Sequence, residues 1–336
     1  MAKKVAVIGG DGIGPEVIGA GMQVLEALAL PIEYLPARAG LQCKRDTGSY
    51  LPEETLRAVG AADAVYFGAI TSPLASEDPN YKSVILQLRN ELDAYANLRP
   101  AVDYGQPCLY PGLDLVIVRE NSEGLYNAPE TVDAEGVTTH RRVTRKGCDR
   151  VSEYAFQYAR AKGRKEVTCA HKANVLRESD GLFRKTFYEV HKRHAAAGSP
   201  VAAKDILLDN CAMQLVKNPR GFDTIVTLNL YGDVLSDLAA GLVGGLGFAP
   251  SGNFGPTKAL FEPVHGSAPD ITGKGIANPV GAIMSAALML EYLGMQRKAE
   301  EIGRAVRAAL KQGMTPDVGG KLGTQAFTDL VVKALR

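Results

Sequence analysis

The chain has 336 residues, of which 46% are hydrophobic and 22% are charged, a composition typical of a soluble globular protein of about two domains. Its net charge is +1, so no overall basic field exists to attract nucleic acid or an anionic membrane. The five cysteines are scattered and form no CxxC pair, which disfavours a disulfide framework and a structural zinc site and favours the reducing cytoplasm.

The N-terminal segment predicts a strand, a glycine turn and a helix. Val5–Ile8 is an apolar run too short for a signal peptide, and no later stretch reaches the roughly 20 apolar residues of a membrane-spanning helix. Gly9–Gly14 forms the turn, and apolar residues then recur at helical spacing from Val17 to Leu28. The glycines do not match the dinucleotide-binding fingerprint G-x-G-x-x-G, because Pro15 stands in place of the third glycine.

Further apolar segments predict strands that alternate with helices. These segments are Ala64–Phe67, Asp114–Val118, Thr168–His171 and Thr224–Thr227. Such alternation predicts an α/β fold with substantial parallel pairing. Domain boundaries are expected near Arg99-Pro100, where a helix should stop before proline, and near Gly247–Pro250.

Residues 127–147 differ from the rest of the chain. They are polar and rich in β-branched residues, with few candidates for a core. An exposed strand pair that reaches across a subunit interface and a plain surface hairpin explain this composition equally well.

Three arginines are spaced by about one secondary-structure element each. Arg89 lies on a predicted helix Lys82–Tyr95, Arg99 follows that helix, and Arg119 ends a predicted strand. Ligands bind where strands and helices end in α/β sheets, and guanidinium groups there can pair with carboxylates of an acidic substrate. Taken singly, each arginine is more typical of a solvated surface.

An acidic cluster accompanies the arginines. Asp233 and Asp237 stand four residues apart and share one face if the segment is helical, and Asp209 ends another apolar run. Three carboxylates without histidine or thiolate suit a hard cation such as Mg²⁺ or Mn²⁺. As a single residue, Asp233 is more typical of a helix cap.

Two residues are candidate proton carriers, and one loop is a candidate nucleotide site. Tyr126 follows Arg119 by seven residues, and Lys172 comes directly after a predicted strand. A lysine beside a bound cation can act as a base, whereas His171 is more typical of a structural histidine. The loop Glu262–Pro279 is rich in glycine and proline, and its Asp270 can accept hydrogen bonds from two ribose hydroxyls and repel a 2′-phosphate.

These segments together resemble the β-decarboxylating dehydrogenase family of isocitrate, homoisocitrate and 3-isopropylmalate dehydrogenases. Gly10–Glu16 is similar to its N-terminal turn, Asn229–Gly247 to its signature segment and His265–Asp270 to its adenosine loop. The resemblance covers essentially the whole chain. It implies a two-domain α/β fold with a mixed central sheet that is not a Rossmann fold.

The resemblance also implies a division of the chain and a shared active site. Residues 1–100 with 248–336 would form the cofactor-binding domain that contains both termini. Residues 101–247 would form an inserted domain for substrate, metal and dimerisation, with the arm 127–147 pairing with a second subunit. Lys172 and Asp209 would then face the partner's active site in a homodimer or tetramer.

By the same resemblance, the chain oxidises and decarboxylates a 2-hydroxy-3-carboxy acid with NAD⁺ and Mg²⁺ or Mn²⁺. Lys172 would be the base for the hydroxyl proton, and Tyr126 would be the acid that protonates the enol carbon. The implied substrate residues are Ser72, Leu86, Arg89, Arg99, Arg119 and Asn174, and the implied metal ligands are Asp209, Asp233 and Asp237. The implied cofactor residues are His265, Gly266, Ser267, Ala268, Asp270, Ile271 and Asn278.

Substrate choice within the family rests on a few segments. Residues 119–126, 170–174 and 71–73 are similar to the homoisocitrate and isocitrate branch, whereas Leu86 stands where that branch often carries arginine, as in isopropylmalate enzymes. The expected order is homoisocitrate, converted to 2-oxoadipate in the 2-aminoadipate route to lysine, then isocitrate, then 3-isopropylmalate, with dual activity open. A non-catalytic nucleotide-binding homologue is disfavoured, because neither proton carrier and no metal aspartate is lost.

Overall fold

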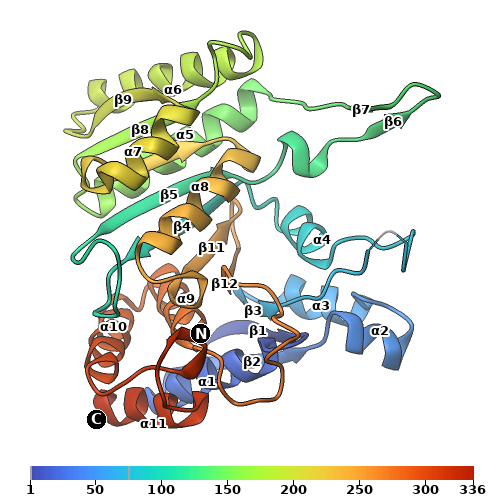
Figure 1. Cartoon of the computed structure of the whole chain (residues 1–336), viewed down its shortest axis with the longest axis vertical. Coiled ribbons are helices and arrows are strands. Elements are labelled where there is room, and N and C mark those ends of the chain that lie inside the picture. Colours follow the sequence, from blue (N-terminus) through green and yellow to red (C-terminus); the bar gives the residue numbers. More distant parts are fainter. Residues whose placement is uncertain (1, 75) are drawn as a thin grey trace. The chain divides into compact units, whose positions relative to one another are not determined.

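The computed structural model describes residues 2–74 and 76–336, and the chain forms two compact units (Figure 1). Unit 1 comprises Met1–Leu92, Asp103–Pro111 and Val243–Arg336, and unit 2 comprises Asp93–Val102 and Gly112–Leu242. Both termini therefore belong to unit 1. The boundaries differ from the expected ones at 100 and 247, because residues 93–100 group with unit 2, whereas residues 103–111 and 243–247 group with unit 1.

Unit 1 is an α/β unit on a mixed sheet with the strand order β2-β1-β3-β12-β11. The strands are β1 (Lys3–Gly10), β2 (Ile32–Ala37), β3 (Ala64–Ala69), β12 (Ala259–Pro263) and β11 (Pro250–Phe254). All neighbours are parallel except β11 and β12. Four longer helices pack on one another: α1 (Gly14–Ala27), α9 (Val280–Tyr292), α10 (Gln296–Leu310) and α11 (Thr324–Leu335). The shorter helices of the unit are α2 (Leu41–Thr47), α3 (Glu53–Ala61) and α4 (Val84–Glu91), with the 3₁₀ turns η3 (Leu246–Phe248) and η4 (Pro316–Val318).

Unit 2 is also an α/β unit on a mixed sheet, with the order β4-β5-β10-β8-β9. The strands are β4 (Ala96–Val102), β5 (Asp114–Glu120), β10 (Thr224–Thr227), β8 (Glu166–His171) and β9 (Ala202–Leu207). Only β4 and β5 are antiparallel. The helices are α5 (Arg145–Ala161), α6 (Ser179–Ala196), α7 (Leu208–Lys217) and α8 (Asn229–Leu242), with short turns η1 (Gly124–Asn127) and η2 (Pro219–Gly221).

A two-stranded hairpin accounts for most of the unusual segment 127–147. Strands β6 (Glu130–Val132) and β7 (Val137–Thr139) pair only with each other, and all six residues are exposed. The hairpin extends away from the sheet of unit 2 (Figure 1). Helix α5 begins at Arg145, so the last three residues of the predicted arm belong to that helix.

The strands expected from apolar runs are all present. Strand β10 has the predicted bounds, and the other four expected strands are longer by two residues at one or both ends. Buried on both faces, β3 is apolar throughout, as parallel strands covered by helices require. No helix in the described part of the chain is long and apolar enough to cross a membrane.

The predicted helix Lys82–Tyr95 was wrong at both ends. Helix α4 runs only from Val84 to Glu91, with Ser83 as its cap, so Lys82 lies outside it. Arg99 and Pro100 lie within strand β4 and do not mark a helix end. Pro100 has no N–H to donate, and its place in the strand does not require one toward β5. Val116, its partner on β5, donates its own N–H to Asp223 O at 3.1 Å and not to Pro100, so Pro100 and Val116 exchange no hydrogen bond.

Candidate active site

Helix α8 presents two carboxylates to two buried arginines. Asp233 and Asp237 lie one turn apart, as their spacing predicted. Arg99 Nη1, from β4, lies 3.2 Å from Asp233 Oδ1 and 3.3 Å from Asp237 Oδ1, and Arg119 Nη1, from β5, also pairs with Asp233. Both arginine side chains are at least 91% buried, whereas the carboxylate side chain of Asp237 is 49% exposed. The arginines are thus held by the protein, while the carboxylates remain open to a ligand.

The chemistry of this face fits a hard cation. Burial raises the pKa of Asp237, and the charge of Asp233 adds to the effect, while Arg99 and Arg119 oppose it. A divalent cation at the two carboxylates would relieve their repulsion, and oxygen ligands are those that Mg²⁺ and Mn²⁺ prefer. Over residues 2–74 and 76–336, no group of three or more His, Cys, Asp or Glu side chains gathers as a complete metal site.

Tyr126 lies on η1 beside the same face. Its hydroxyl is hydrogen-bonded to the Asp233 carboxylate, and the Arg119 guanidinium lies 4.6 Å from the centre of its ring. Burial raises the pKa of Tyr126, and the hydrogen bond to Asp233 raises it further. The phenol therefore keeps its proton at neutral pH and is placed to donate it.

Lys172 and Asp209 form a second cluster in unit 2. Lys172 directly follows β8, as predicted, and Asp209 is the second residue of α7. Their side chains pair, and this hydrogen bond lowers the pKa of Asp209. The Asp209 side chain is 64% exposed, so an aqueous face or a second molecule can reach it.

Two residues that sequence reasoning assigned no role hold Arg119 in place. Buried Asn229 accepts hydrogen bonds from Arg119 Nε at 3.1 Å and Nη2 at 2.8 Å, and its Nδ2 donates to Glu123 O at 2.9 Å. A Cβ at Gly232 would lie 2.6 Å from Arg119 Cβ and Cγ, so only glycine lets α8 approach β5 this closely. Both residues lie in the segment Asn229–Gly247, which was the available signal.

In unit 1 the glycine turn supports the loop after β12. Gly12 has φ +60°, and a Cβ there would lie 2.0 Å from Ser267 O. Ile13 N donates to Ser267 O at 2.9 Å, and Thr71 Oγ1 donates to Ser267 Oγ at 2.8 Å. The turn therefore packs on the candidate nucleotide loop, which explains its glycines without a dinucleotide fingerprint.

The candidate nucleotide loop carries unsatisfied polar groups. Buried His265 Nε2 and Asn278 Nδ2 have no hydrogen-bond partner among the described residues. Burial lowers the pKa of His265, so its ring is neutral at physiological pH. Asp270 is exposed, and no described side chain is bonded to its carboxylate. Donors and acceptors left open in one loop fit a ligand such as an adenosine group.

The remaining loop residues are placed by the backbone. Gly266 is exposed and its O lies 2.9 Å from His265 Nδ1. Ala268 has φ +40°, and its O accepts from Ile271 N at 3.2 Å. Asn278 is held from outside the loop, because its backbone N–H donates to Asp317 at 2.7 Å.

Arg89 also lies in unit 1, whereas Arg99 and Arg119 lie in unit 2. Its Nη2 donates to Glu262 Oε1 at 3.0 Å, and both side chains are at least 90% buried. Arg89 Nε has no partner in the described chain. Glu262 also accepts from Asn253 at 2.9 Å, and this anchoring role escaped sequence reasoning.

Three further candidates lie on surfaces. Leu86 is half-buried on α4, and Asn174 is exposed after β8. Ser72 Oγ lies 3.2 Å from Tyr81 Oη. His171, expected to be structural, is buried and lies 3.0 Å from Asp205, with Ala173 N donating to its Nδ1.

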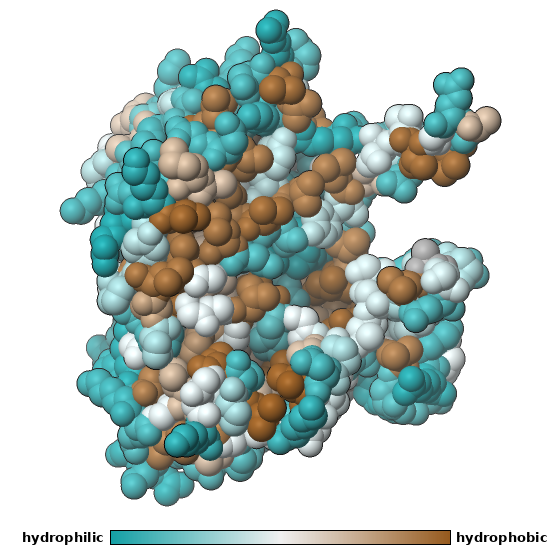
Figure 2. All heavy atoms as spheres, viewed as in Figure 1, coloured by the Kyte–Doolittle hydropathy of each residue, from teal (hydrophilic) through white to brown (hydrophobic). Residues whose placement is uncertain are grey.

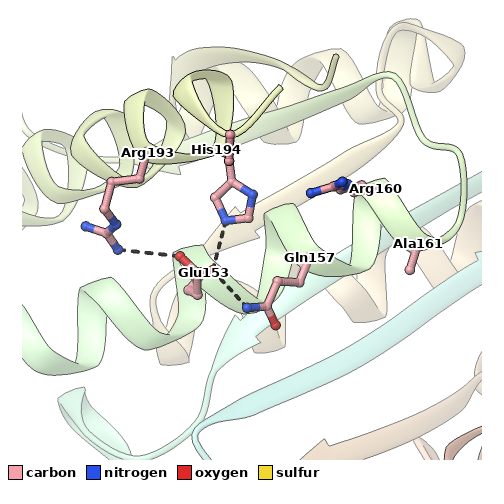
Figure 3. Close-up of a pocket in the computed structure, with 7 residues that line it drawn as sticks. Glu153, Gln157, Arg160, Ala161, Arg193 and His194 are labelled. Atoms are coloured by element: carbon pink, nitrogen blue, oxygen red, sulfur yellow. Dashed lines mark hydrogen bonds and ion pairs between the residues drawn. The ribbon is translucent and has the colours of Figure 1, made fainter. Parts of the chain in front are cut away.

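A pocket of about 600 Å³ between α5 and α6 contains none of the candidate residues (Figure 3). Glu153, one of the residues that line the pocket, interacts with Gln157 at 2.8 Å, His194 at 2.9 Å and Arg193 at 3.4 Å. These polar groups satisfy one another, so the network joins the two helices.

Comparison with known proteins places the whole chain in one group. The family described as isocitrate/isopropylmalate dehydrogenase matches residues 4–331. The chain is 50% identical over 337 residues to an isocitrate/homoisocitrate dehydrogenase of Thermus thermophilus (100% of this chain, 99% of that one). It is 49% identical over 334 residues to a 3-isopropylmalate dehydrogenase of Methanothermobacter thermautotrophicus (99% and 98%). The crystal structure of isocitrate dehydrogenase from Methylococcus capsulatus matches with a TM-score of 0.94 at 41% identity and 99% coverage of both chains.

Proposed function

We propose, since the chain belongs to the isocitrate/isopropylmalate dehydrogenase family, that this β-decarboxylating dehydrogenase oxidises homoisocitrate to 2-oxoadipate with NAD⁺. Isocitrate is the second substrate, and 3-isopropylmalate oxidation is the alternative function, favoured by Leu86 at the position of a possible tail-binding arginine. One observation supports the assignment of this reaction to particular residues: Asp233 and Asp237, on one face of α8, both form ion pairs with Arg99.

The arginines bind the substrate carboxylates, and two side chains move protons. The Lys172 amine takes the proton of the substrate hydroxyl as the carbonyl forms. After CO₂ leaves, the Tyr126 phenol donates a proton to the enol carbon. His265, Asp270 and Asn278 would hold NAD⁺, which would supply the hydride acceptor, and Asp233 and Asp237 would hold a divalent cation, which would supply Lewis-acid stabilisation of charge on the substrate oxygen.

We assign the cation to Asp233 and Asp237 of one subunit and Asp209 of another. The separate placement of Asp209 beside Lys172 supports this assignment. Among the described residues, ten of the twelve exposed large hydrophobic side chains belong to unit 2, and four of them, Met213, Val216, Leu230 and Val234, lie on α7 and α8. Figure 2 shows the hydrophobic residues that gather on this face of the molecule. A second copy of the chain would bury this apolar surface, and the arm would reach across the interface.

The candidate nucleotide loop favours NAD⁺ over NADP⁺. Asp270 has a free carboxylate to accept ribose hydroxyls, and a 2′-phosphate would face like charge there. Unit 1 is accordingly assigned to cofactor binding, with His265 and Asn278 as further contacts.

Steady-state rates with NAD⁺, Mg²⁺ and each of the three acids test the substrate proposal. We expect kcat/KM to be highest for homoisocitrate, then isocitrate, then 3-isopropylmalate. A higher value for 3-isopropylmalate than for both tricarboxylic acids would replace the proposal by the alternative. Leu86→Arg then tests the reason, since an arginine left unpaired against an isopropyl group should abolish 3-isopropylmalate oxidation and spare the activity with the two tricarboxylic acids.

A further inference from the structure

A fully buried carboxylate lies behind Lys172. Asp180, the second residue of α6, has 0% of its side chain exposed. A buried charge is costly unless it is paired and hydrogen-bonded. Asp180 Oδ1 accepts from Arg141 Nη2 at 2.9 Å, and Oδ2 accepts from the backbone N–H of Lys172 at 2.7 Å. The two oxygens thus serve two segments far from each other in the sequence.

The first segment is the base of the arm. Arg141 follows β7 by two residues, and its side chain is only 17% exposed. Its guanidinium lies 5.3 Å from the ring centre of Tyr231, which stands on α8 two residues before Asp233. The Asp180–Arg141 pair therefore contacts the helix that carries the candidate metal ligands.

The second segment is the turn that begins at Lys172. Val175 N and Leu176 N donate to Lys172 O at 3.0 and 2.9 Å, and Asp180 N donates to Leu176 O at 3.0 Å. The main chain of Lys172 is thus held from both sides, by this turn through its carbonyl and by Asp180 through its N–H. No other side chain within the described residues is bonded to that N–H.

We propose that Asp180 is a positioning residue that fixes Lys172 for proton transfer and, through Arg141, makes its placement depend on the arm. This inference rests on the proposed role of Lys172 as the base. Loss of the carboxylate charge would free Arg141 and let the arm base and the Lys172 turn move independently. Assembly of the arm with a second subunit and correct placement of the base would then no longer be linked.

The test compares Asp180→Asn with a matched control elsewhere in unit 2. Asp223 has the same pair of bonds, since it accepts from Arg164 Nη1 at 3.1 Å and from Lys165 N at 2.5 Å. We expect Asp180→Asn to lower kcat roughly 10- to 100-fold, with KM for the acid changed less than about twofold, because the base is misplaced while the substrate arginines are intact. Asp223→Asn should leave kcat unchanged, although it removes the same kind of arginine and backbone contacts from a side chain that is 24% exposed.

Arg141 variants test the link to the arm. Arg141→Gln should lower kcat by a factor similar to that of Asp180→Asn, and the double variant should have a kcat no lower than that of either single variant. Arg141→Lys, which keeps the charge, should retain most of the wild-type kcat. Circular dichroism of each variant reports folding. If Asp180→Asn does not fold, the comparison of kcat in Arg141→Gln with kcat in Arg141→Lys still tests the inference. Wild-type kcat in Arg141→Gln, or equal kcat in Asp180→Asn and Asp223→Asn, would overturn the inference.

Lys172→Met separates this inference from the proposed function. A large loss of kcat in Lys172→Met with no loss in Asp180→Asn would remove only the positioning role. Full kcat in Lys172→Met would instead remove the role of the base itself, on which the inference depends.

Discussion

Arg119 and Asp233 are joined by an ion pair in which the guanidinium side chain is 1% exposed and the carboxylate side chain is 30% exposed. The arginine belongs to the interior of unit 2, and the carboxylate lies at its edge. Because of this difference in exposure, Arg119 is held by its hydrogen bonds to Asn229, while Asp233 remains accessible to a cation and a substrate. The proposed catalysis at this site therefore depends on Arg119 staying buried and Asp233 staying accessible.

Asp233→Asn should lower kcat by at least about 10²-fold, because the proposed metal ligand and the hydrogen-bond partner of Tyr126 are lost together. Steady-state rates and titration of Mn²⁺ binding by electron paramagnetic resonance measure both effects. Asp329→Asn on α11 is the control, since it removes an exposed carboxylate of the same kind in unit 1. Activity that survives exhaustive chelation with EDTA would contradict the metal assignment.

Gly232→Ala should destabilise the protein by about 1–3 kcal/mol and lower kcat, because the new methyl group must displace Arg119 or α8. Gly241→Ala on the same helix is the control, as no described atom other than its chain neighbours and the backbone of its own helix lies within 4 Å of its added Cβ. It should stabilise the helix by about 0.5–1 kcal/mol with unchanged kcat. Urea unfolding of both variants distinguishes them, and equal shifts in the same direction would refute the close-approach argument.

Replacement of Asp270 and Ile271 by lysine and tyrosine should shift the preference from NAD⁺ toward NADP⁺, because the added cation meets the 2′-phosphate. Asp270→Asn, which removes only the charge, should weaken NAD⁺ binding. It should reduce the ratio of kcat/KM for NAD⁺ to kcat/KM for NADP⁺ without reversing it. The measurement is kcat/KM for both nucleotides at saturating acid. Comparable wild-type values for NAD⁺ and NADP⁺ would rule out this role of Asp270.

The stability of unit 2 should fall at acid pH through Asp205. Burial acts to raise the pKa of Asp205, but hydrogen bonds from Arg184, Tyr188 and His171 outweigh it and hold the pKa well below its ordinary value of 3.8. Since the folded pKa is depressed, the stabilisation is complete above the unfolded pKa and is lost as pH falls below it. Asp205→Asn should therefore cost about 1–3 kcal/mol at pH 6 and progressively less below pH 4. Chemical unfolding of both proteins from pH 6 to pH 3 measures the difference, and a difference independent of pH would contradict the prediction.

Local pattern was sufficient for much of the fold and for part of the site. Apolar runs located β1, β3, β5, β8 and β10, and the four-residue spacing of Asp233 and Asp237 placed them on one helix face. Lys172 at the end of β8 followed from the same reasoning. These features depend on periodicity, which short windows of sequence contain.

Features that depend on distant partners were missed. Arg99 was expected at a helix end because Pro100 follows it, but pairing with β5 draws the segment into a strand. The roles of Asn229, Glu262 and Asp180 arise from partners that lie 110, 173 and 39 residues away. No local spacing encodes such contacts, so a single sequence could not reveal them.

The most direct test of the central claim, that each active site is built from two subunits, is complementation between inactive variants. Lys172→Met and Tyr126→Phe, each nearly inactive alone, are mixed, unfolded and refolded together so that subunits reassort. Half of the dimers would then be hybrids with one intact site, and activity with homoisocitrate should recover to about a quarter of wild type. Mixing without refolding is the control. No recovery from a mixture shown by mass spectrometry to contain hybrid dimers would contradict the claim, because Lys172 and Tyr126 would then serve the same subunit's site.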